Sequence, residues 1–185
     1  ANMGLPKGSS IAIASPNSIS ACLTFMGIVY GGYVALPLNL VAGAKVLGYT
    51  LAHSKAALIF VQSDCQDMIQ EAMQEAKSTA NTCPLDLNDG PQWLENSPAT
   101  SKPNAPIDNP NADSIGVLMY TSGTTGNPKG VMLTHHNMVA ANRSITTYLR
   151  NTPDDIVLNV LPLSFDYGLY QWLMCCNYGG TLVLE

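Results

Sequence analysis

The sequence predicts an α/β fold in which a mostly parallel sheet is flanked by helices. Short apolar runs typical of buried strands alternate with longer amphipathic runs typical of helices. Parallel neighbours in a sheet need a crossover that returns the chain to the same end, so this alternation favours a doubly wound arrangement. A length of 185 residues is enough for one domain with a full core, and we expect all of it to belong to one α/β domain.

The first half of the chain is predicted to alternate regularly between strand and helix. Strands are expected at residues 10–15, 33–39 and 56–61, and helices at 18–32, 42–54 and 63–77. A pair of glycines closes the first helix. Ser63 and Gln66 have the spacing of a capping box, in which two side chains bond the free N–H groups at the start of a helix.

A segment rich in proline and asparagine, residues 79–113, interrupts this pattern. Half of the twelve prolines lie between Pro84 and Pro110, with Asn, Asp and Ser in the gaps. These residues favour turns. The segment is therefore expected to be a long surface excursion.

The second half of the chain returns to alternation. Strands are expected at residues 114–120, 130–135, 155–163 and 181–185, and helices at 135–150 and 166–180. Thr134 and Asn137 are expected to open the first of these helices.

Charge and hydropathy argue against two classes of partner. The net charge is −5, and the eight Lys and Arg residues are not clustered, so the chain has no basic stripe for a nucleic-acid backbone. No apolar run approaches the roughly 20 residues of a membrane span. We therefore expect a soluble, cytoplasmic protein that binds no nucleic acid.

The five cysteines do not form a metal or disulfide pattern. Their number is odd and none has CxxC spacing. They are expected to be free, buried thiols, and no metal site is predicted from the chain's own residues. They are Cys22, Cys65, Cys83, Cys175 and Cys176.

The chain carries few charges for a soluble domain. Charged residues make up 11%, against roughly 25% in a typical domain. The sequence reads as a piece of a longer protein, and exposed apolar surface is expected where the remainder docks.

The stretch "YTSGTTGNPKG", residues 120–130, is the strongest functional signal. Glycines let a backbone approach a ligand closely, the hydroxyl groups donate hydrogen bonds without charge, and Lys129 adds one cation. Exposed main-chain N–H groups and these donors suit a polyphosphate. A flexible turn rich in small residues is the alternative.

Two familiar phosphate motifs do not fit this loop. A P-loop needs lysine followed by Ser or Thr, whereas Lys129 lies between Pro128 and Gly130. A dinucleotide fingerprint needs G-x-G-x-x-G opening a helix, whereas this loop has G-x-x-G and leads into a predicted strand. A phosphotransferase of the P-loop type is therefore disfavoured.

The longer stretch "YTSGTTGNPKGVMLTHHN" resembles the signature loop of the AMP-forming adenylating superfamily. This superfamily comprises acyl-CoA synthetases, peptide-synthetase adenylation domains and luciferases of the firefly type. "GSSIAIASPNSISACLTFMGIVYGGYVALPLN" is similar to its opening strand-helix-strand unit, and "LPLSFDYGL" to its next core motif. The resemblance implies that residues 1–185 are part of the large N-terminal domain, with a small C-terminal domain and its catalytic lysine beyond Glu185.

The resemblance also implies a reaction and its cofactors. A carboxylic acid attacks the α-phosphate of ATP, accompanied by Mg²⁺, to give an acyl-adenylate and pyrophosphate. The acyl group then passes to the thiol of coenzyme A or of a carrier's phosphopantetheine. Lys129 and Thr121 are the implied catalytic residues, with Lys129 as a clamp on the leaving pyrophosphate. The implied nucleotide-binding residues are Thr121, Ser122, Gly123, Thr124, Thr125, Gly126 and Lys129.

The matching segment for acyl selectivity leaves the substrate open. It carries the implied substrate-binding residues Phe165, Asp166, Tyr167 and Gly168. Phe165-Asp166 is similar to members that activate amino acids, in which the carboxylate pairs with an ammonium group, and a carboxylate in a pocket wall needs such a partner. Tyr167-Gly168 looks more like the acyl-CoA ligases. Asp166 could instead cap the helix that follows it.

Three functions stay open at this point. The first is an acyl-CoA or acyl-carrier ligase acting on a small carboxylic acid. The second is an amino-acid-adenylating domain. The third is a nucleotide-binding module without catalysis.

Overall fold

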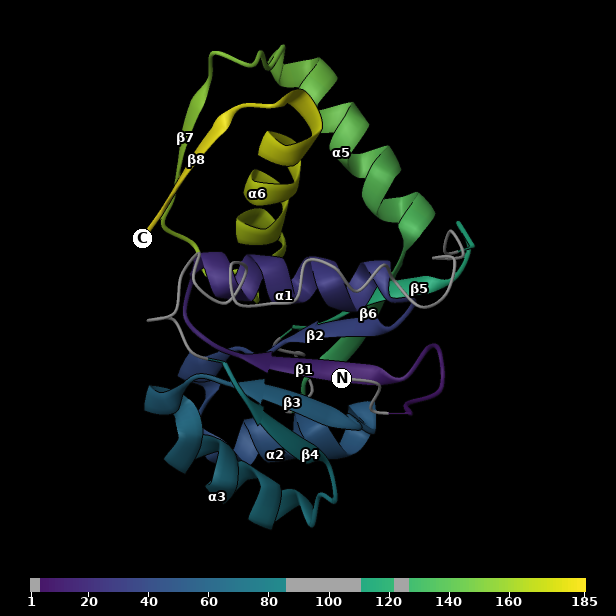
Figure 1. The fold of residues 1–185 in the computed structure, drawn as a ribbon, viewed down its shortest axis with the longest axis vertical. Helices are drawn as coiled ribbons and strands as arrows, with labels where there is room; N and C mark the ends of the chain where they lie inside the picture. The colour runs from purple at the N-terminus through teal and green to yellow at the C-terminus, as the bar shows by residue number, and fades with distance from the viewer. Residues whose placement is uncertain (1–3, 86–110, 122–126) are drawn as a thin grey trace, which may run out of the picture.

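A computed structural model describes residues 4–85, 111–121 and 127–185. The described residues form a six-stranded sheet with strand order β4-β3-β1-β2-β5-β6 and a separate two-stranded sheet, β7-β8 (Figure 1). All neighbouring strands are parallel except β5 and β6, which are antiparallel. The strands are β1 Ser10–Ala14, β2 Val34–Pro37, β3 Leu58–Val61, β4 Asn81–Pro84, β5 Ile115–Thr121, β6 Lys129–Thr134, β7 Ile156–Asn159 and β8 Thr181–Leu184.

The helices lie on both faces of the large sheet. α2 and α3 cover one face, and α1 lies on the other, between the large sheet and the part of the chain formed by α5, α6, β7 and β8 (Figure 1). The helices are α1 Ile19–Tyr30, α2 Ala44–Ser54, α3 Gln66–Ala76, α5 His135–Leu149 and α6 Asp166–Tyr178, with short 3₁₀ turns η1 Leu40–Ala42 and η2 Ser63–Cys65. The predicted α/β class, with a mostly parallel sheet flanked by helices, is confirmed.

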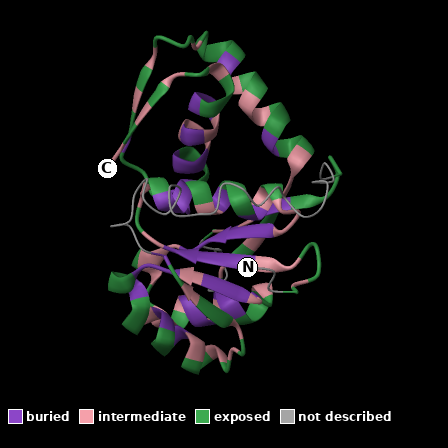
Figure 2. Cartoon of the chain, in the orientation of Figure 1, coloured by how far each residue is buried: buried purple, intermediate pink, exposed green. Residues whose placement is uncertain are grey.

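Two apolar clusters on opposite faces of the sheet hold these layers together. Side chains along β5 alternate between them, because successive residues of a strand point to opposite faces. Val117 and Met119 pack with α1 and α6, whereas Leu118 and Tyr120 pack with α2 and α3. In Figure 2 the buried residues are concentrated in β1, β2 and β3 and in the helices that face them.

α1 and α6 meet in the first of these clusters. The rings of Phe25 and Trp172 pack edge to face with centroids 5.2 Å apart and an interplanar angle of 81°, an arrangement that aromatic pairs prefer. This contact joins the large sheet's helix layer to the helix that leads into β8.

One detail of the strand prediction is wrong, and two features of strand pairing were not predicted. The excursion predicted at 79–113 begins with β4, which pairs with β3 at the edge of the sheet; residues 86–110 lie outside the described part of the chain. β6 runs against its neighbour because only a short loop joins it to β5, and a short loop cannot return a strand to the same end. β7 and β8 pair with each other rather than joining the large sheet.

One of the two predicted helix openings is confirmed. Thr134 precedes α5, and its hydroxyl accepts the N–H of Asn137 at 3.1 Å while the Asn137 side chain accepts the N–H of Thr134 at 3.1 Å. The capping box predicted at Ser63 and Gln66 is wrong. The chain there forms η2, and α3 starts at Gln66 without a side-chain cap.

The five cysteines are free in the structure. Cys22, Cys65 and Cys175 are buried, as predicted, but Cys83 is half-buried and Cys176 is exposed on α6. Burial raises the pKa of the Cys22 thiol to about 12. Among the described residues, no helix is both long and apolar enough to cross a membrane.

Candidate functional site

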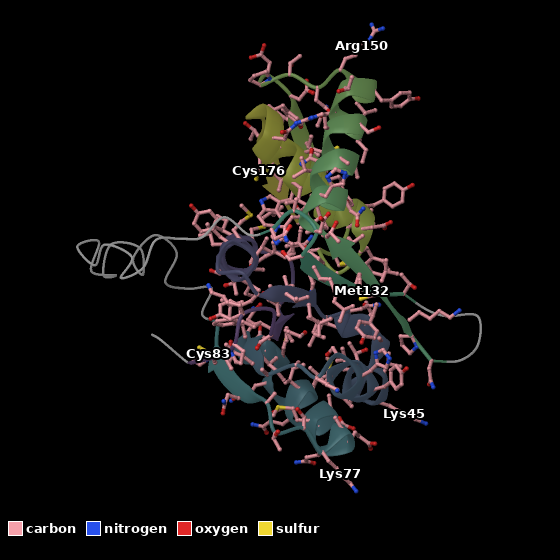
Figure 3. All side chains as sticks on the ribbon, turned by 90° about the vertical axis from the view of Figure 1, so that its right-hand side faces the viewer. Lys45, Lys77, Cys83, Met132, Arg150 and Cys176 are labelled. Carbon is pink, nitrogen blue, oxygen red and sulfur yellow. The ribbon has the colours of Figure 1, made fainter. Side chains whose placement is uncertain are left out.

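The two implied catalytic residues face each other across the β5–β6 hairpin. Thr121 ends β5 and Lys129 begins β6, and they are paired residues in the antiparallel register. Both are exposed, so a hydroxyl donor and a cation stand together at the mouth of the loop. The other implied nucleotide-binding residues, Ser122, Gly123, Thr124, Thr125 and Gly126, lie outside the described residues. Met132 marks β6 in Figure 3.

The base of this hairpin is held by a contact with α2. The Tyr120 hydroxyl and His53 Nδ1 are 2.6 Å apart, and the His53 ring in turn stacks on Tyr49 with centroids 5.5 Å apart. Burial, and to a lesser extent Tyr49, raises the pKa of Tyr120 to about 12. The phenol therefore stays protonated at neutral pH and remains available to this hydrogen bond.

Sequence reasoning gave His53 no role. Its partner is 67 residues away in the chain, and no local pattern links the end of a helix to a residue in a distant strand. The alternation of side chains along β5 was the one available signal, because it directs Tyr120 toward the face that α2 covers.

The four implied substrate-binding residues lie at the start of α6, and three of them are exposed. Phe165 is the residue before the helix, and the side chains of Phe165, Asp166 and Tyr167 reach solvent. One Asp166 carboxylate oxygen accepts the N–H of Tyr167 at 2.8 Å. The argument that a carboxylate buried in a pocket wall needs an ammonium partner does not hold for the described chain, since Asp166 is exposed.

The structure also corrects the capping alternative for Asp166. The N-cap position belongs to Phe165, which makes no side-chain cap bond, and Asp166 is the first residue of the helix. A carboxylate in the first turn is favourable because the free N–H groups there carry partial positive charge.

Gly168 differs from its three neighbours because it is buried against main chain. A Cβ atom at this position would lie 2.3 Å from the carbonyl oxygen of Pro162 and 2.5 Å from that of Leu161. Packing of α6 on the preceding turn therefore accounts for the glycine. A contact between Gly168 and substrate stays a prediction.

A buried asparagine that sequence reasoning missed fixes the same turn. Asn159, which is fully buried at the end of β7, donates from Nδ2 to the carbonyl of Gly168 at 2.9 Å. Its Oδ1 accepts the N–H of Leu161 at 3.1 Å. One side chain thus joins the end of β7 to the first turn of α6. Alternation in an apolar run could have flagged Asn159 as inward-facing, but not its partners.

A pocket lies beside this turn. Its volume is about 240 Å³, and it opens between the carboxyl ends of β1 and β2 and the segment that follows β7. Its walls are mainly apolar, with Phe25, Leu38 and Leu163 among them. Among the described residues, none of those predicted to bind nucleotide or substrate lines it.

The histidines that follow the loop belong to the start of α5. The main-chain N–H groups of His135 and His136 donate to the carbonyls of Ser114 and Ala112 at 3.1 and 2.8 Å. Burial lowers the pKa of His135, so its ring is neutral at pH 7. These bonds tie the start of α5 to the segment that precedes β5.

Metal binding finds little support in the described part of the chain. No three His, Cys, Asp or Glu side chains there lie close enough together to hold a metal ion.

Comparison with known proteins gives one family over the whole chain. The family described as AMP-binding enzyme matches residues 1–185. A sulfoacetate–CoA ligase from Cupriavidus necator is 36% identical over an alignment of 185 residues that covers 98% of this chain and 35% of that enzyme. The phosphinothricin tripeptide synthetase PhsC of Streptomyces viridochromogenes is 31% identical over 183 residues, which are 99% of this chain and 16% of the synthetase.

Solved structures agree with this match. VinN is 26% identical to this chain and superposes with a TM-score of 0.83. The match covers 98% of this chain and 46% of VinN. Apo MatB from Rhodopseudomonas palustris is 26% identical with a TM-score of 0.78, and the match covers 98% of this chain and 35% of MatB. The described chain thus spans about a third of the CoA ligase it matches and less than half of these structures.

Proposed function

Because the chain belongs to the AMP-binding enzyme family, we propose that the protein containing it is an ATP-dependent, AMP-forming ligase that joins a carboxylic acid to a thiol. In the first half-reaction the carboxylate displaces pyrophosphate from ATP to give an acyl-adenylate. In the second, a thiol takes the acyl group and AMP leaves. The observation that carries the proposal is the pairing of Thr121 with Lys129 at the mouth of a glycine- and threonine-rich loop.

Thr121 and Lys129 suit the departure of pyrophosphate. Negative charge builds on the leaving group as the α-phosphate bond breaks, and donors already aimed at that charge favour the transition state. Both residues lie in paired strands, so their main chain is held in place before ATP binds. In this proposal Lys129 holds charge rather than accepting a proton.

The cofactors of the proposal are ATP, Mg²⁺ and a thiol acceptor. The hydroxyl and ammonium donors at the loop mouth are compatible with the anionic oxygens of ATP, and Mg²⁺ would supply further positive charge against those oxygens when bound. Among the relatives, the sulfoacetate enzyme is named as a CoA ligase and PhsC as a peptide synthetase. We favour coenzyme A as the acceptor, since the CoA ligase is the more similar of the two. A cytoplasmic location fits these cofactors.

Activation of an amino acid is the second candidate. Phe165-Asp166 carries it, because an exposed carboxylate at the start of α6 could pair with a substrate ammonium group. The structural neighbours include VinN in complex with 3-methylaspartate. Under this candidate the Asp166 side chain would contact the substrate directly.

The test is carboxylate-dependent exchange of labelled pyrophosphate into ATP, measured on the complete polypeptide that contains residues 1–185. The panel holds short sulfonated, fatty, aryl and amino acids. Lys129→Ala should lower the exchange rate by on the order of 10²-fold, the usual effect of losing one oxyanion donor. Lys45→Ala, a change at an exposed lysine of α2, is the matched control and should leave the rate unchanged.

The outcomes separate the candidates. Exchange driven by non-amino carboxylates supports the acyl ligase, and exchange driven only by amino acids, and weakened by Asp166→Asn, supports the second candidate. A folded protein that binds ATP but exchanges with no carboxylate would contradict both.

A further inference from the structure

The loop that follows β1 makes an unusual set of long-range bonds through one side chain, that of Asn17. Its Nδ2 group donates to the carbonyl of Leu161 at 2.9 Å and to the carbonyl of Glu185 at 3.0 Å. Its Oδ1 accepts the N–H of Leu163 at 3.0 Å. Both donors and the acceptor of one amide are thus used on main chain that lies 144 to 168 residues away.

These bonds reach the turn that carries the implied substrate residues. Between the end of β7 and the start of α6, the N–H of Leu161 bonds the side chain of Asn159 and the N–H of Leu163 bonds the side chain of Asn17. The next turn bond is from the N–H of Phe165 to the carbonyl of Pro162, at 2.9 Å. Side-chain amides therefore take the place of a strand partner in this segment.

The two asparagines fix different things. Asn159 belongs to β7, and its side chain bonds the main chain of Leu161 and Gly168, which follow β7 directly. Asn17 belongs to the crossover that leaves the large sheet between β1 and α1. Its side chain ties the turn to the carboxyl edge of the large sheet, the edge at which β5 ends in Thr121.

This position has a consequence for two-substrate chemistry. Thr121 and Lys129 belong to the large sheet, whereas Phe165 and Asp166 lie between the two strands of the small one. A carboxylate and an α-phosphate react only when held within about 3–3.5 Å in line, and a displacement of about 1 Å can lower the rate by on the order of 10²-fold. The hydrogen bonds of Asn17 therefore fix the position of the turn relative to the large sheet.

We propose that Asn17 is a positioning residue for the carboxylic acid substrate, acting through the 161–166 turn. The inference rests on the proposed ligase function. Asn17 touches neither substrate; it holds the turn against the large sheet and so fixes Phe165 and Asp166 relative to Thr121 and Lys129.

The test is Asn17→Asp in the complete polypeptide, because it keeps the size and the acceptor but replaces the donor with an oxygen that faces two carbonyls. The matched control is Asn142→Asp. Asn142 Nδ2 also donates to a distant carbonyl, that of Leu173, at 2.9 Å, but it joins α5 to α6 away from the turn. Both residues are half-buried, so the two changes are comparable in kind.

Losing hydrogen bonds of this kind should raise the KM for the carboxylic acid by on the order of tenfold, while the KM for ATP stays within about twofold. Hydrogen exchange at the amides of residues 160–166 should also become faster in Asn17→Asp and not in Asn142→Asp. If Asn17→Asp does not fold, Asn17→Ser, which keeps one donor, is measured in the same way.

Equal rises in both KM values, or the same carboxylate effect in Asn142→Asp, would show a general structural role and overturn the inference. So would an unchanged carboxylate KM in Asn17→Asp, where the wild-type protein does exchange pyrophosphate. Absence of exchange in the wild type is a different failure, since it removes the proposed function itself and the inference with it.

Discussion

At the scale of single residues, Gly168 shows how a sequence motif can have a packing cause. Its Cα lies against the carbonyls of Pro162 and Leu161, where a Cβ would come within 2.5 Å of both oxygens. We expect Gly168→Ala to lower the free energy of unfolding by about 1–3 kcal/mol, the usual effect of overpacking. Urea unfolding followed by circular dichroism measures it.

A second glycine in a helix supplies the matched control for this prediction. Gly27 lies in α1, and a Cβ there would meet no atom within 4 Å. Gly27→Ala should therefore raise the free energy of unfolding by up to about 1 kcal/mol, because alanine is the better helix former. Equal effects of the two substitutions would contradict the packing explanation of Gly168.

Tyr120 gives a prediction for alkaline pH. Its pKa is raised to about 12 in the folded protein, chiefly by burial, against about 10 in an unfolded chain. The folded-state value is the higher one, so the associated stability is complete below pH 10 and is lost as the pH rises toward 12. Tyr120→Phe removes this titration.

Two measurements test the role of Tyr120. At pH 8 the Tyr120→Phe variant should be less stable than wild type by about 1 kcal/mol, because the hydrogen bond to His53 is lost. Between pH 9 and pH 11.5 its stability should fall less than that of wild type. Tyr30→Phe, at an exposed position of α1, should follow wild type throughout, and a Tyr120 variant that also followed it would refute the prediction.

At the scale of elements, α3 ends on a residue in a strained conformation. Lys77 has φ +48°, the left-handed region that costs an L-residue roughly 1–2 kcal/mol and costs glycine little. Lys77→Gly should raise the free energy of unfolding by about 0.5–1 kcal/mol and therefore raise the midpoint of thermal unfolding. Lys45, which is exposed at the start of α2, is the control, and both lysines are labelled in Figure 3. Lys45→Gly should lower the midpoint; a fall in both variants would exclude strain at Lys77.

The helices and strands also show which parts of the fold could be predicted from local sequence patterns. Strand and helix order was predictable from apolar runs, and the box at Thr134 and Asn137 formed as its spacing suggests. The box at Ser63 and Gln66 did not, because the chain there makes a 3₁₀ turn before the helix. Asn81–Pro84 was predicted as loop because it contains a proline, which is tolerated at the sheet edge that β4 occupies.

The candidate site was predictable only where its residues form one local stretch of sequence. The loop mouth at Thr121 and Lys129 followed from a local stretch of sequence, and the structure pairs them. His53, Asn17 and Asn159 were not predictable as supporting residues. Each acts through a partner set by tertiary packing, such as the bond from Asn17 to Leu163, and single-sequence periodicity carries no information about which distant groups meet.

At the scale of the whole molecule, the small sheet is incomplete as it stands. Parallel strands are normally buried on both faces, and two strands alone are marginally stable. Leu182 and Leu184 of β8 pack toward α1 and α6, but the outward side chains of the sheet, Ile156, Leu158 and Val183, are exposed. Their exposed fractions are 73%, 54% and 42%. Figure 2 shows the exposed residues alternating along both strands.

These three residues define the β7–β8 outer face, which agrees with the expected exposure of apolar surface. We predict that the 185-residue chain binds a hydrophobic dye through this face, since apolar patches open to water attract such probes. Leu158→Thr combined with Val183→Thr keeps residues that favour strands and should remove most of the dye fluorescence. Val139→Thr, at a residue of α5 that is 58% exposed, should leave it unchanged. Dye binding that persisted in the double variant would place the exposed apolar surface elsewhere, on α1 or α5. The β7–β8 outer face would then not be the reason for the chain's low content of charged residues.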